Sequence, residues 1–307
     1  MRRFRTTVLG AVLLALLLVL GACGSGEDDE PGTGGGATEE KPELTVGSEN
    51  FAEAQIVGEM YAQVLENAGY TVDRQLNVET REIRLPAMES GEIDIAPEYL
   101  ASLLSVIDPD VTPSTDASEA ASQLEEPLAE RGLAVLEPSN VVDTNAFVTT
   151  QEVADEHSLA AVSDLEGVAQ DLVLGGPTEC PDRPFCIPGL KKVYNVEFGE
   201  FKSLDYGATI TALSGGEIDV GLLFSTDGTI AEEGFVLLED DKQLQAADNI
   251  TPLVREEILT DEVAQLLNEV SAAIETDAIT ELNRRANVDV EDPADLAEEY
   301  LTELGLI

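Results

Sequence analysis

Two aromatic side chains stand at matching places in two similar stretches of this sequence. Pro86–Ser102 reads PAMESGEIDIAPEYLAS, and Thr211–Asp227 reads TALSGGEIDVGLLFSTD. Both stretches contain Gly-Glu-Ile-Asp, and an aromatic residue follows at the same distance, Tyr99 in the first and Phe224 in the second. The faces of aromatic rings attract cations. Two such rings in one cleft could therefore hold a small positively charged group.

The elements that position these rings are predicted to be the same in both stretches. Each has the pattern of a helix end, a glycine stop, a short apolar strand and a turn that carries the ring. In open α/β sheets, ligands bind beyond the carboxyl ends of the strands. One ring from each half thus indicates two lobes that face a shared cleft. A chance match of a common helix–glycine–strand unit, with each ring buried in its own core, is the alternative that this pattern leaves open.

Enzyme chemistry is not indicated by the remaining polar residues. The sequence has no GxSxG or HExxH motif, and its single histidine, His157, lies in a polar segment. Carboxylate runs such as Glu239-Asp240-Asp241 are usually solvated faces in so acidic a chain. We therefore expect a protein that is not an enzyme and needs no cofactor.

The net charge limits the possible partners. The 307 residues include 62 Asp and Glu but only 16 Lys and Arg, which gives a formal net charge of -46. Nucleic-acid binding requires clustered basic residues, and anionic membrane surfaces would repel this chain. A surface lipoprotein that binds a macromolecule is a further alternative, and it would show an exposed apolar patch in place of a closed cleft. The length is sufficient for one large or two medium domains.

The beginning of the chain is predicted to target it for export. Residues 1–22 contain three arginines followed by the apolar run Val8–Leu20, and LGAC, ending at Cys23, resembles a bacterial lipobox, in which the cysteine is lipidated. An uncleaved membrane helix is the alternative, although the run is short for a bilayer span. Residues 23–42 are rich in Gly, Asp and Glu and predict a flexible tether. We expect an extracytoplasmic protein that reaches the membrane only through its lipid.

The other two cysteines, Cys180 and Cys186, remain as a pair if Cys23 carries a lipid. In an exported protein such a pair predicts a local disulfide. A metal site is not expected, because zinc prefers four ligands and only His157 could be added.

The first strand and helix offer a second kind of site. Leu44–Gly47 is predicted to be a strand, and the segment after it has the apolar stripe of a helix. Asn50 and Glu53 have the spacing of a capping box. A helix N-terminus beside a strand end offers free backbone N–H groups to a carboxylate. Ser48 and Asn50 are therefore candidates to face a ligand, or they only cap the helix.

Five segments of the chain carry a family resemblance. They are VGSENFAEAQIVGEMYAQVLENAGY, SGEIDIAPEY, PGLKKVY, STDGTIAEEGFVLLEDDK and NITPLVR. As a set, and in this order over residues 43–307, they resemble the substrate-binding proteins of osmoprotectant ABC transporters, the glycine betaine/choline-binding family. The resemblance implies a two-lobed α/β fold of the periplasmic-binding-protein class, type II-like, that closes over one small cationic or zwitterionic solute. It also implies a membrane permease as the partner that receives the solute.

The resemblance also implies where the lobes divide. Lobe 1 would comprise residues 43–141 and 249–307, and lobe 2 would comprise residues 142–248. Two crossings between lobes make a hinge, so residues near Val142 and Asn249 are expected to absorb the closing motion.

The family's ligand contacts can be carried over to several positions. A quaternary ammonium has no N–H to donate and is held by aromatic faces. Since the chain has no Trp, the cage is expected to use Tyr99, Phe147 and Phe224. Arg183 matches the family arginine that grips the betaine carboxylate, and a guanidinium suits that role. A solvent-facing loop arginine is the alternative.

Other positions depart from the family. Extra carboxylates would favour choline-like cations that lack an acid group, or they mark a different polar solute such as ergothioneine or an amino-acid-like compound. Glycine betaine stays the first expectation because Arg183 and the helix start offer a carboxylate site. The departing positions are Asn145 for an aspartate, Phe147 for a tyrosine, Ser102 for a threonine, Glu49 for a lysine, and Asp248 or Asn249 for a tyrosine.

Overall fold

The structure, a computed structural model, describes residues 41–307 except residue 79. The predicted targeting segment, Cys23 and the tether up to residue 40 lie outside the described residues. Lys41, placed in the predicted tether, belongs to the folded part: its Nζ donates to the Ala68 carbonyl at 2.8 Å and pairs with Glu262 at 2.7 Å. In the part of the chain that is described, no helix combines the length and the apolar character needed to cross a bilayer.

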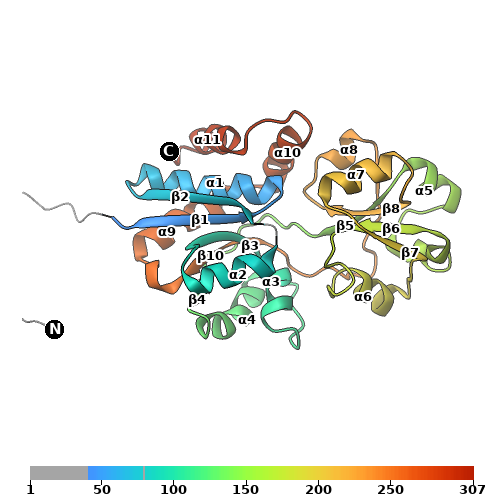
Figure 1. Ribbon diagram of the computed structural model, residues 1–307, viewed down its shortest axis with the longest axis horizontal. Coiled ribbons are helices and arrows are strands. Elements are labelled where there is room, and N and C mark those ends of the chain that lie inside the picture. The colour runs from blue at the N-terminus through green and yellow to red at the C-terminus, as the bar shows by residue number, and fades with distance from the viewer. Residues whose placement is uncertain (1–40, 79) are drawn as a thin grey trace, which may run out of the picture. The chain divides into compact units, whose positions relative to one another are not determined.

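Lobe 1 is built on a five-stranded mixed sheet with the order β2-β1-β3-β10-β4 (Figure 1). β1 pairs in parallel with β2 and β3, whereas β10 runs antiparallel to β3 and β4. The strands are β1 (Glu43–Glu49), β2 (Thr71–Val78), β3 (Ile95–Tyr99), β4 (Leu133–Val135) and β10 (Ile250–Arg255). The helices are α1 (Ala52–Asn67), α2 (Arg81–Ser90), α3 (Leu100–Ile107), α4 (Ala117–Ala129), α9 (Asp261–Ala273), α10 (Thr276–Asn287) and α11 (Pro293–Leu304).

Lobe 2 repeats this plan with the order β7-β6-β8-β5-β9. β6 pairs in parallel with β7 and β8, and β5 runs antiparallel to β8 and β9. The chain is thus an α/β protein with two lobes, as expected. The strands are β5 (Asn145–Thr149), β6 (Val173–Gly176), β7 (Glu200–Ser203), β8 (Val220–Phe224) and β9 (Val236–Leu237). The helices are α5 (Gln151–His157), α6 (Ile187–Gly189), α7 (Tyr206–Ser214) and α8 (Thr229–Glu232), with shorter helical turns at Val162–Leu165, Ala169–Asp171 and Leu190–Tyr194; a further turn, Glu256–Ile258, belongs to lobe 1.

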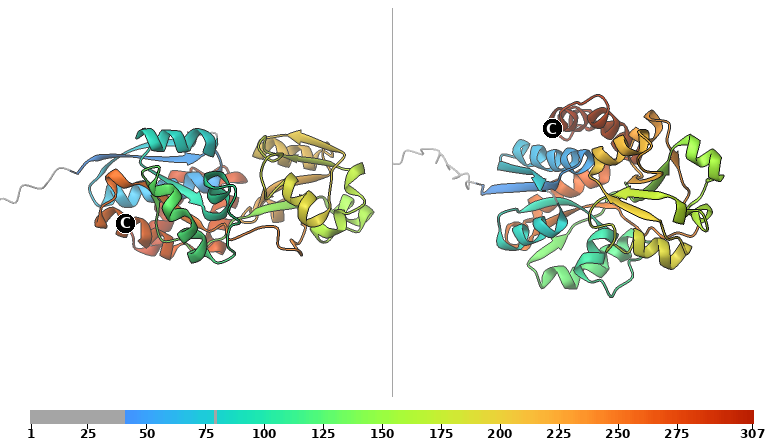
Figure 2. Two further views of the ribbon diagram at one scale, coloured as in Figure 1. Left: turned by 90° about the horizontal axis from the view of Figure 1, so that it is seen from below. Right: turned by 45° about the vertical axis from the view of Figure 1, so that its right-hand side comes forward.

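Two connecting segments join the lobes and run side by side (Figure 2). Val142 and Asn249 form an isolated antiparallel bridge, the Asp143 N–H donates to the Asp248 carbonyl at 3.0 Å, and the Ile250 N–H donates to Val141 at 3.1 Å. The two connections are thus hydrogen-bonded to each other where the chain passes between the lobes. A hinge at this place stays our proposal.

The two similar stretches of sequence adopt the predicted local structure. α2 ends at Ser90, and Gly91 follows with a φ of +83°, a left-handed conformation that a side chain would strain. α7 ends at Ser214, and its left-handed glycine, Gly216 with φ +68°, comes one residue later, after Gly215. The strands β3 and β8 come next, and Tyr99 and Phe224 are their last residues. One expectation needs correction: Tyr99 does not sit in a turn, because the helix α3 begins directly after it.

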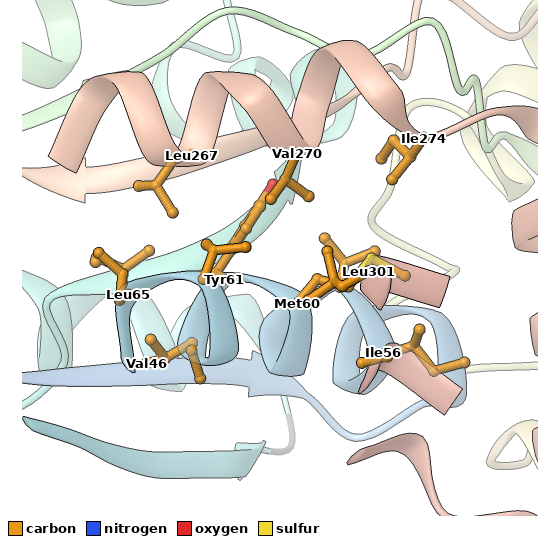
Figure 3. Close-up of a cluster of buried hydrophobic side chains, with 14 of the residues drawn as sticks. Val46, Ile56, Met60, Tyr61, Leu65, Leu267, Val270, Ile274 and Leu301 are labelled. Atoms are coloured by element: carbon orange, nitrogen blue, oxygen red, sulfur yellow. The ribbon is translucent and has the colours of Figure 1, made fainter. Parts of the chain in front are cut away.

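The helix α1 is packed into the hydrophobic core of lobe 1 and follows directly after Phe51. Its buried side chains pack on β1 and on the C-terminal helices, as Figure 3 shows. The capping-box prediction is wrong: α1 begins at Ala52, Phe51 occupies the N-cap position, and no side chain caps it. The labelled members of this cluster are Val46, Ile56, Met60, Tyr61, Leu65, Leu267, Val270, Ile274 and Leu301.

Candidate functional site

Three aromatic rings from both lobes meet in one place. The Phe51 ring lies 6.0 Å from the Tyr99 ring, centroid to centroid, and 5.1 Å from the Phe224 ring, on which it is stacked with an interplanar angle of 24°. All three line a pocket of about 100 Å³. The expectation that the strand-end rings of the two halves share one cleft is therefore confirmed. Phe51, the ring that joins them, was not predicted.

Most of the predicted polar residues lie around the same pocket. The predicted lining residues that the structure brings together are Glu49, Tyr99, Ser102, Asn145, Arg183, Phe224 and Asp248. The lining residues that the sequence analysis missed are Phe51, Arg81, Asp143, Glu179 and Phe185, together with small or apolar neighbours. The wall thus combines aromatic rings with several carboxylates and two arginines.

Four predicted residues do not line this pocket. Ser48 is fully buried, and its hydroxyl donates to the Glu49 carbonyl at 3.1 Å. Asn249 is buried in the joint between the lobes and donates to the Ser139 carbonyl at 2.9 Å. Phe147 lies in the hydrophobic core of lobe 2. Asn50 lines a neighbouring depression that shares Phe51 and Phe224 with the pocket.

Phe147 is displaced from the pocket by the register of its strand. β5 pairs with β8 so that Asn145 lies opposite Phe224 and Phe147 lies opposite Leu222. Two residues along a strand correspond to about 7 Å. Asn145 therefore reaches the ligand edge of the sheet, whereas Phe147 is set back into the core and does not contribute to the aromatic wall.

Asp248 and Ser102 form a polar pair in the pocket. One carboxylate oxygen of Asp248 accepts from the Ser102 backbone N–H at 2.9 Å, and the other accepts from the Ser102 hydroxyl at 2.5 Å. Burial raises the pKa of Asp248 to about 6, although these hydrogen bonds oppose the shift. Ser102 thus holds a carboxylate whose charge changes near neutral pH.

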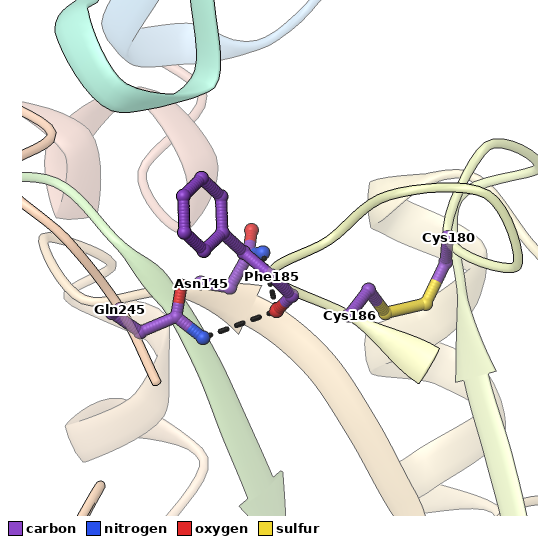
Figure 4. Close-up of a disulfide and its surroundings, with 5 residues drawn as sticks. All are labelled: Asn145, Cys180, Phe185, Cys186 and Gln245. Atoms are coloured by element: carbon purple, nitrogen blue, oxygen red, sulfur yellow. Dashed lines mark hydrogen bonds between the residues drawn. A yellow bond between two sulfur atoms is a disulfide. The ribbon is translucent and has the colours of Figure 1, made fainter. Parts of the chain in front are cut away.

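Arg183 is carried by a loop that the disulfide closes. Cys180 and Cys186 are bonded, with their Cα atoms 5.3 Å apart. Figure 4 shows that the backbone carbonyl of Phe185 accepts from the Asn145 and Gln245 side-chain amides, each at 3.1 Å. These bonds fix the loop to β5 and to the segment after β9.

The guanidinium of Arg183 is already engaged by the protein. It is only partly exposed and forms an ion pair with Glu82 on α2 of lobe 1. A ligand carboxylate that binds Arg183 would compete with Glu82. The arginine is therefore not a solvent-facing loop residue, the alternative that the sequence left open.

A second arginine in the pocket wall, Arg81, belongs to a buried ion network. Its Nε donates to both carboxylate oxygens of Glu98 at 3.0 Å, and Arg84 also pairs with Glu98. Burial alone would raise the pKa of Glu98, but the charges of the two arginines outweigh it and lower the pKa to about 2. Glu49, at a family lysine position, pairs with Arg84 at 3.3 Å. These arginines therefore compensate acidic side chains of lobe 1.

Comparison with known proteins gives consistent relatives over nearly the whole described chain. Residues 42–303 match the family described as the substrate binding domain of ABC-type glycine betaine transport systems. A glycine-betaine-binding protein of Pseudomonas aeruginosa is 27% identical over 86% of this chain and 88% of its own length. The carnitine transport binding protein OpuCC of Listeria monocytogenes is 26% identical over 98% of this chain and 97% of its own.

Solved structures agree with these relatives. The crystal structure of a glycine betaine/carnitine/choline ABC transporter protein superposes with a TM-score of 0.68 at 26% identity, and the match covers 86% of this chain and 99% of that one.

Proposed function

Because the chain belongs to the family of substrate-binding domains of ABC-type glycine betaine transport systems, we propose that it captures a small quaternary-ammonium solute outside the cytoplasm. The solute binds in the pocket between the lobes and is delivered to a membrane permease. Among its relatives are binding proteins named for glycine betaine and for carnitine.

The observation that supports this proposal is the meeting of Phe51, Tyr99 and Phe224 in one pocket. A quaternary ammonium cannot donate a hydrogen bond, so it is retained by aromatic faces and by exclusion of water. Each cation–π contact contributes about 0.5–2 kcal/mol. Three rings together can therefore contribute several kcal/mol to binding, at about 0.5–2 kcal/mol for each contact.

The proposed first ligand is glycine betaine, and choline-like cations are the second candidate. Arg183 offers a partner for a ligand carboxylate, which favours betaine. Glu179 and Asp248 also face the pocket, and their carboxylates favour a cation without an acid group, whereas burial raises the pKa of the neighbouring Asp143 well above its usual range. The two arguments concern different ends of the ligand, so affinity measurements can separate them.

A thermal-shift screen tests the proposed function. Glycine betaine, choline, carnitine, proline betaine and ergothioneine are compared with glycerol, a neutral control, at equal concentration. A ligand at 100 times its dissociation constant stabilises the fold by about 2.7 kcal/mol, so at least one cationic or zwitterionic compound should raise the melting temperature. If none of the five compounds raised the melting temperature, the proposal would be contradicted.

The charge of Asp248 is expected to make cation binding depend on pH. Since its pKa is raised to about 6, the carboxylate is ionised above that pH and becomes protonated below it. A cation binds the ionised form better, so choline affinity should fall by up to about tenfold between pH ~7 and pH ~5. Titration calorimetry at several pH values measures this.

Asp248→Asn should flatten that pH profile, whereas Asp110→Asn, at an exposed position, should leave it unchanged. A wild-type affinity that is constant over this range would exclude Asp248 as a partner of the cation.

We also propose that Cys23 is the site of lipidation and anchors the protein to the outer face of the membrane. The lipobox-like LGAC after an apolar run supports this. In a bacterial host, Cys23→Ser should move the protein from the membrane fraction to the soluble fraction. Equal distribution of the two forms on fractionation would contradict the anchor.

A further inference from the structure

Glu53 is a buried carboxylate behind the aromatic wall, and it accepts hydrogen bonds from three different parts of the fold. It lies in the first turn of α1 with 3% of its surface exposed. The Tyr99 hydroxyl donates to Oε1 at 2.9 Å, and the Thr226 hydroxyl and the Asn283 side-chain amide donate to Oε2 at 2.5 and 2.9 Å. Tyr99 and Asn283 belong to lobe 1, whereas Thr226 belongs to lobe 2. One carboxylate therefore bonds a ring of the pocket and the opposite lobe.

Thr226 is tightly held at this contact. It is 1% exposed, its backbone N–H donates to Asp143 at 3.2 Å, and its carbonyl accepts from Asn283 at 3.1 Å. Two residues later, a Cβ on Gly228 would come within 2.6 Å of the Arg284 Cβ and 2.9 Å of the Thr280 carbonyl. The helix α10 of lobe 1 thus packs directly on the backbone of lobe 2, and the Thr226–Glu53 bond forms only when the lobes are this close.

The carboxylates around Glu53 make the hydrogen bond from Thr226 to Glu53 important. Burial raises the pKa of Glu53, whereas the three donors favour its ionised form. Asp227 and Asp143 of lobe 2 lie nearby, and the charge of Asp227 raises the pKa of Glu53 further, so this repulsion opposes closure. Separation of the lobes would leave a Glu53 oxygen without its Thr226 donor, and a buried acceptor that loses its donor is costly. The Thr226–Glu53 bond therefore stabilises the closed arrangement against the repulsion between Glu53 and Asp227.

We propose that Glu53 is a positioning residue that couples the aromatic wall to lobe closure: it orients Tyr99 for the solute and holds Thr226 of the opposite lobe. The proposal rests on the proposed function only in naming a quaternary ammonium as the bound solute. The lobe contact itself needs no ligand. Glu53 does not line the main pocket and acts through Tyr99 and Thr226.

The test compares Glu53→Gln, Thr226→Val and the double variant. Glutamine at position 53 leaves one acceptor oxygen for the three donors that share two oxygens in the wild type, and valine keeps the shape of threonine without its hydroxyl. We expect each single variant to release glycine betaine about tenfold faster in stopped-flow measurements, with a nearly unchanged association rate. The double variant should be less impaired than the sum of the two single variants, because both changes act on the Thr226–Glu53 bond.

Glu59→Gln is the matched control for Glu53→Gln. Glu59 lies on the same helix, is also buried, and accepts from Arg74 Nε at 2.9 and 3.0 Å inside lobe 1. It should lower the free energy of unfolding without a change in solute release. The coupling would be overturned if Glu53→Gln and Glu59→Gln released solute at equal rates. It would also be overturned if the effects of the two single variants on release were strictly additive, or if Thr226→Val left the release rate unchanged.

Small-angle X-ray scattering without solute separates this proposal from the proposed function. Glu53→Gln and Thr226→Val should increase the radius of gyration, and Glu59→Gln should not. If the wild type binds none of the screened solutes but the two variants still open, the ligand assignment fails and the coupling stands. Should all four scattering curves coincide in that case, the coupling fails as well.

Discussion

Phe51→Ala is expected to weaken binding of a quaternary-ammonium solute more than any other single change in the aromatic wall. Phe51 contacts both Tyr99 and Phe224, and its removal takes away one cation–π contact and the stacked Phe51–Phe224 pair that joins the lobes when they close on a solute. A cation–π contact is worth up to about 2 kcal/mol and an aromatic pair about 0.5–1.5 kcal/mol. The loss should therefore be roughly 30-fold or more in dissociation constant, since about 1.4 kcal/mol corresponds to tenfold. Titration calorimetry measures it directly.

Tyr99→Ala and Phe224→Ala should each cost about tenfold on the same argument. Phe147→Leu is the control, because Phe147 is a core residue of lobe 2. It should reduce the free energy of unfolding by about 1 kcal/mol with an unchanged dissociation constant. If the dissociation constant changed for Phe147→Leu and not for Phe51→Ala, the aromatic cage would instead be Tyr99, Phe147 and Phe224, as the family resemblance implies.

Arg183→Ala is expected to reduce affinity for glycine betaine by roughly tenfold to a hundredfold and to leave choline affinity unchanged. A hydrogen bond to a charged group contributes about 1.5–3 kcal/mol, and only betaine carries a carboxylate for Arg183 to bind. The comparison of the two solutes on one variant cancels any general effect on the loop. Calorimetry with both solutes gives the ratio.

Glu82→Gln provides the reciprocal test. Glu82 occupies the Arg183 guanidinium across the lobes, so its neutralisation should release the arginine and tighten betaine binding several-fold. If Arg183→Ala spared betaine and weakened choline, the assignment of Arg183 to a ligand carboxylate would be reversed.

The parts of the site that were predictable are those encoded in local patterns. Tyr99 and Phe224 follow from a repeated helix–glycine–strand pattern, which places a ring at the carboxyl end of a strand in each lobe. The disulfide between Cys180 and Cys186 follows from the number of cysteines that remain in an exported chain once Cys23 is lipidated. Such features need only a few neighbouring residues to be read.

Phe51 was missed although the same rule could have found it. It comes two residues after the end of β1, so it too stands at the carboxyl end of a strand. The sequence SENF also has the spacing of a helix cap, which favoured a capping role. The observed N-cap is Phe51, and no side chain caps the helix. An aromatic residue at a strand-to-helix junction is the signal that was available.

The other misplacements arise from contacts between distant segments. The position of Phe147 depends on the register of β5 against β8, which a resemblance of residue types does not contain. Whether Asp248 or Asn249 faces the pocket depends on the bridge between the two connecting segments. Arg81 required its buried partner Glu98, 17 residues away, before it could be recognised as part of the wall.

Because Cys180 and Cys186 close the loop, measured affinities will depend on whether this disulfide is oxidised or reduced in the protein preparation. Only six positions separate the two sulfur-bearing residues, and Arg183 lies between them. In material made in a reducing compartment, the loop that carries this arginine would lack the disulfide and would be held by hydrogen bonds such as those to the Phe185 carbonyl. Its discrimination between betaine and choline would then differ from that of oxidised material, with the same sequence and the same overall fold.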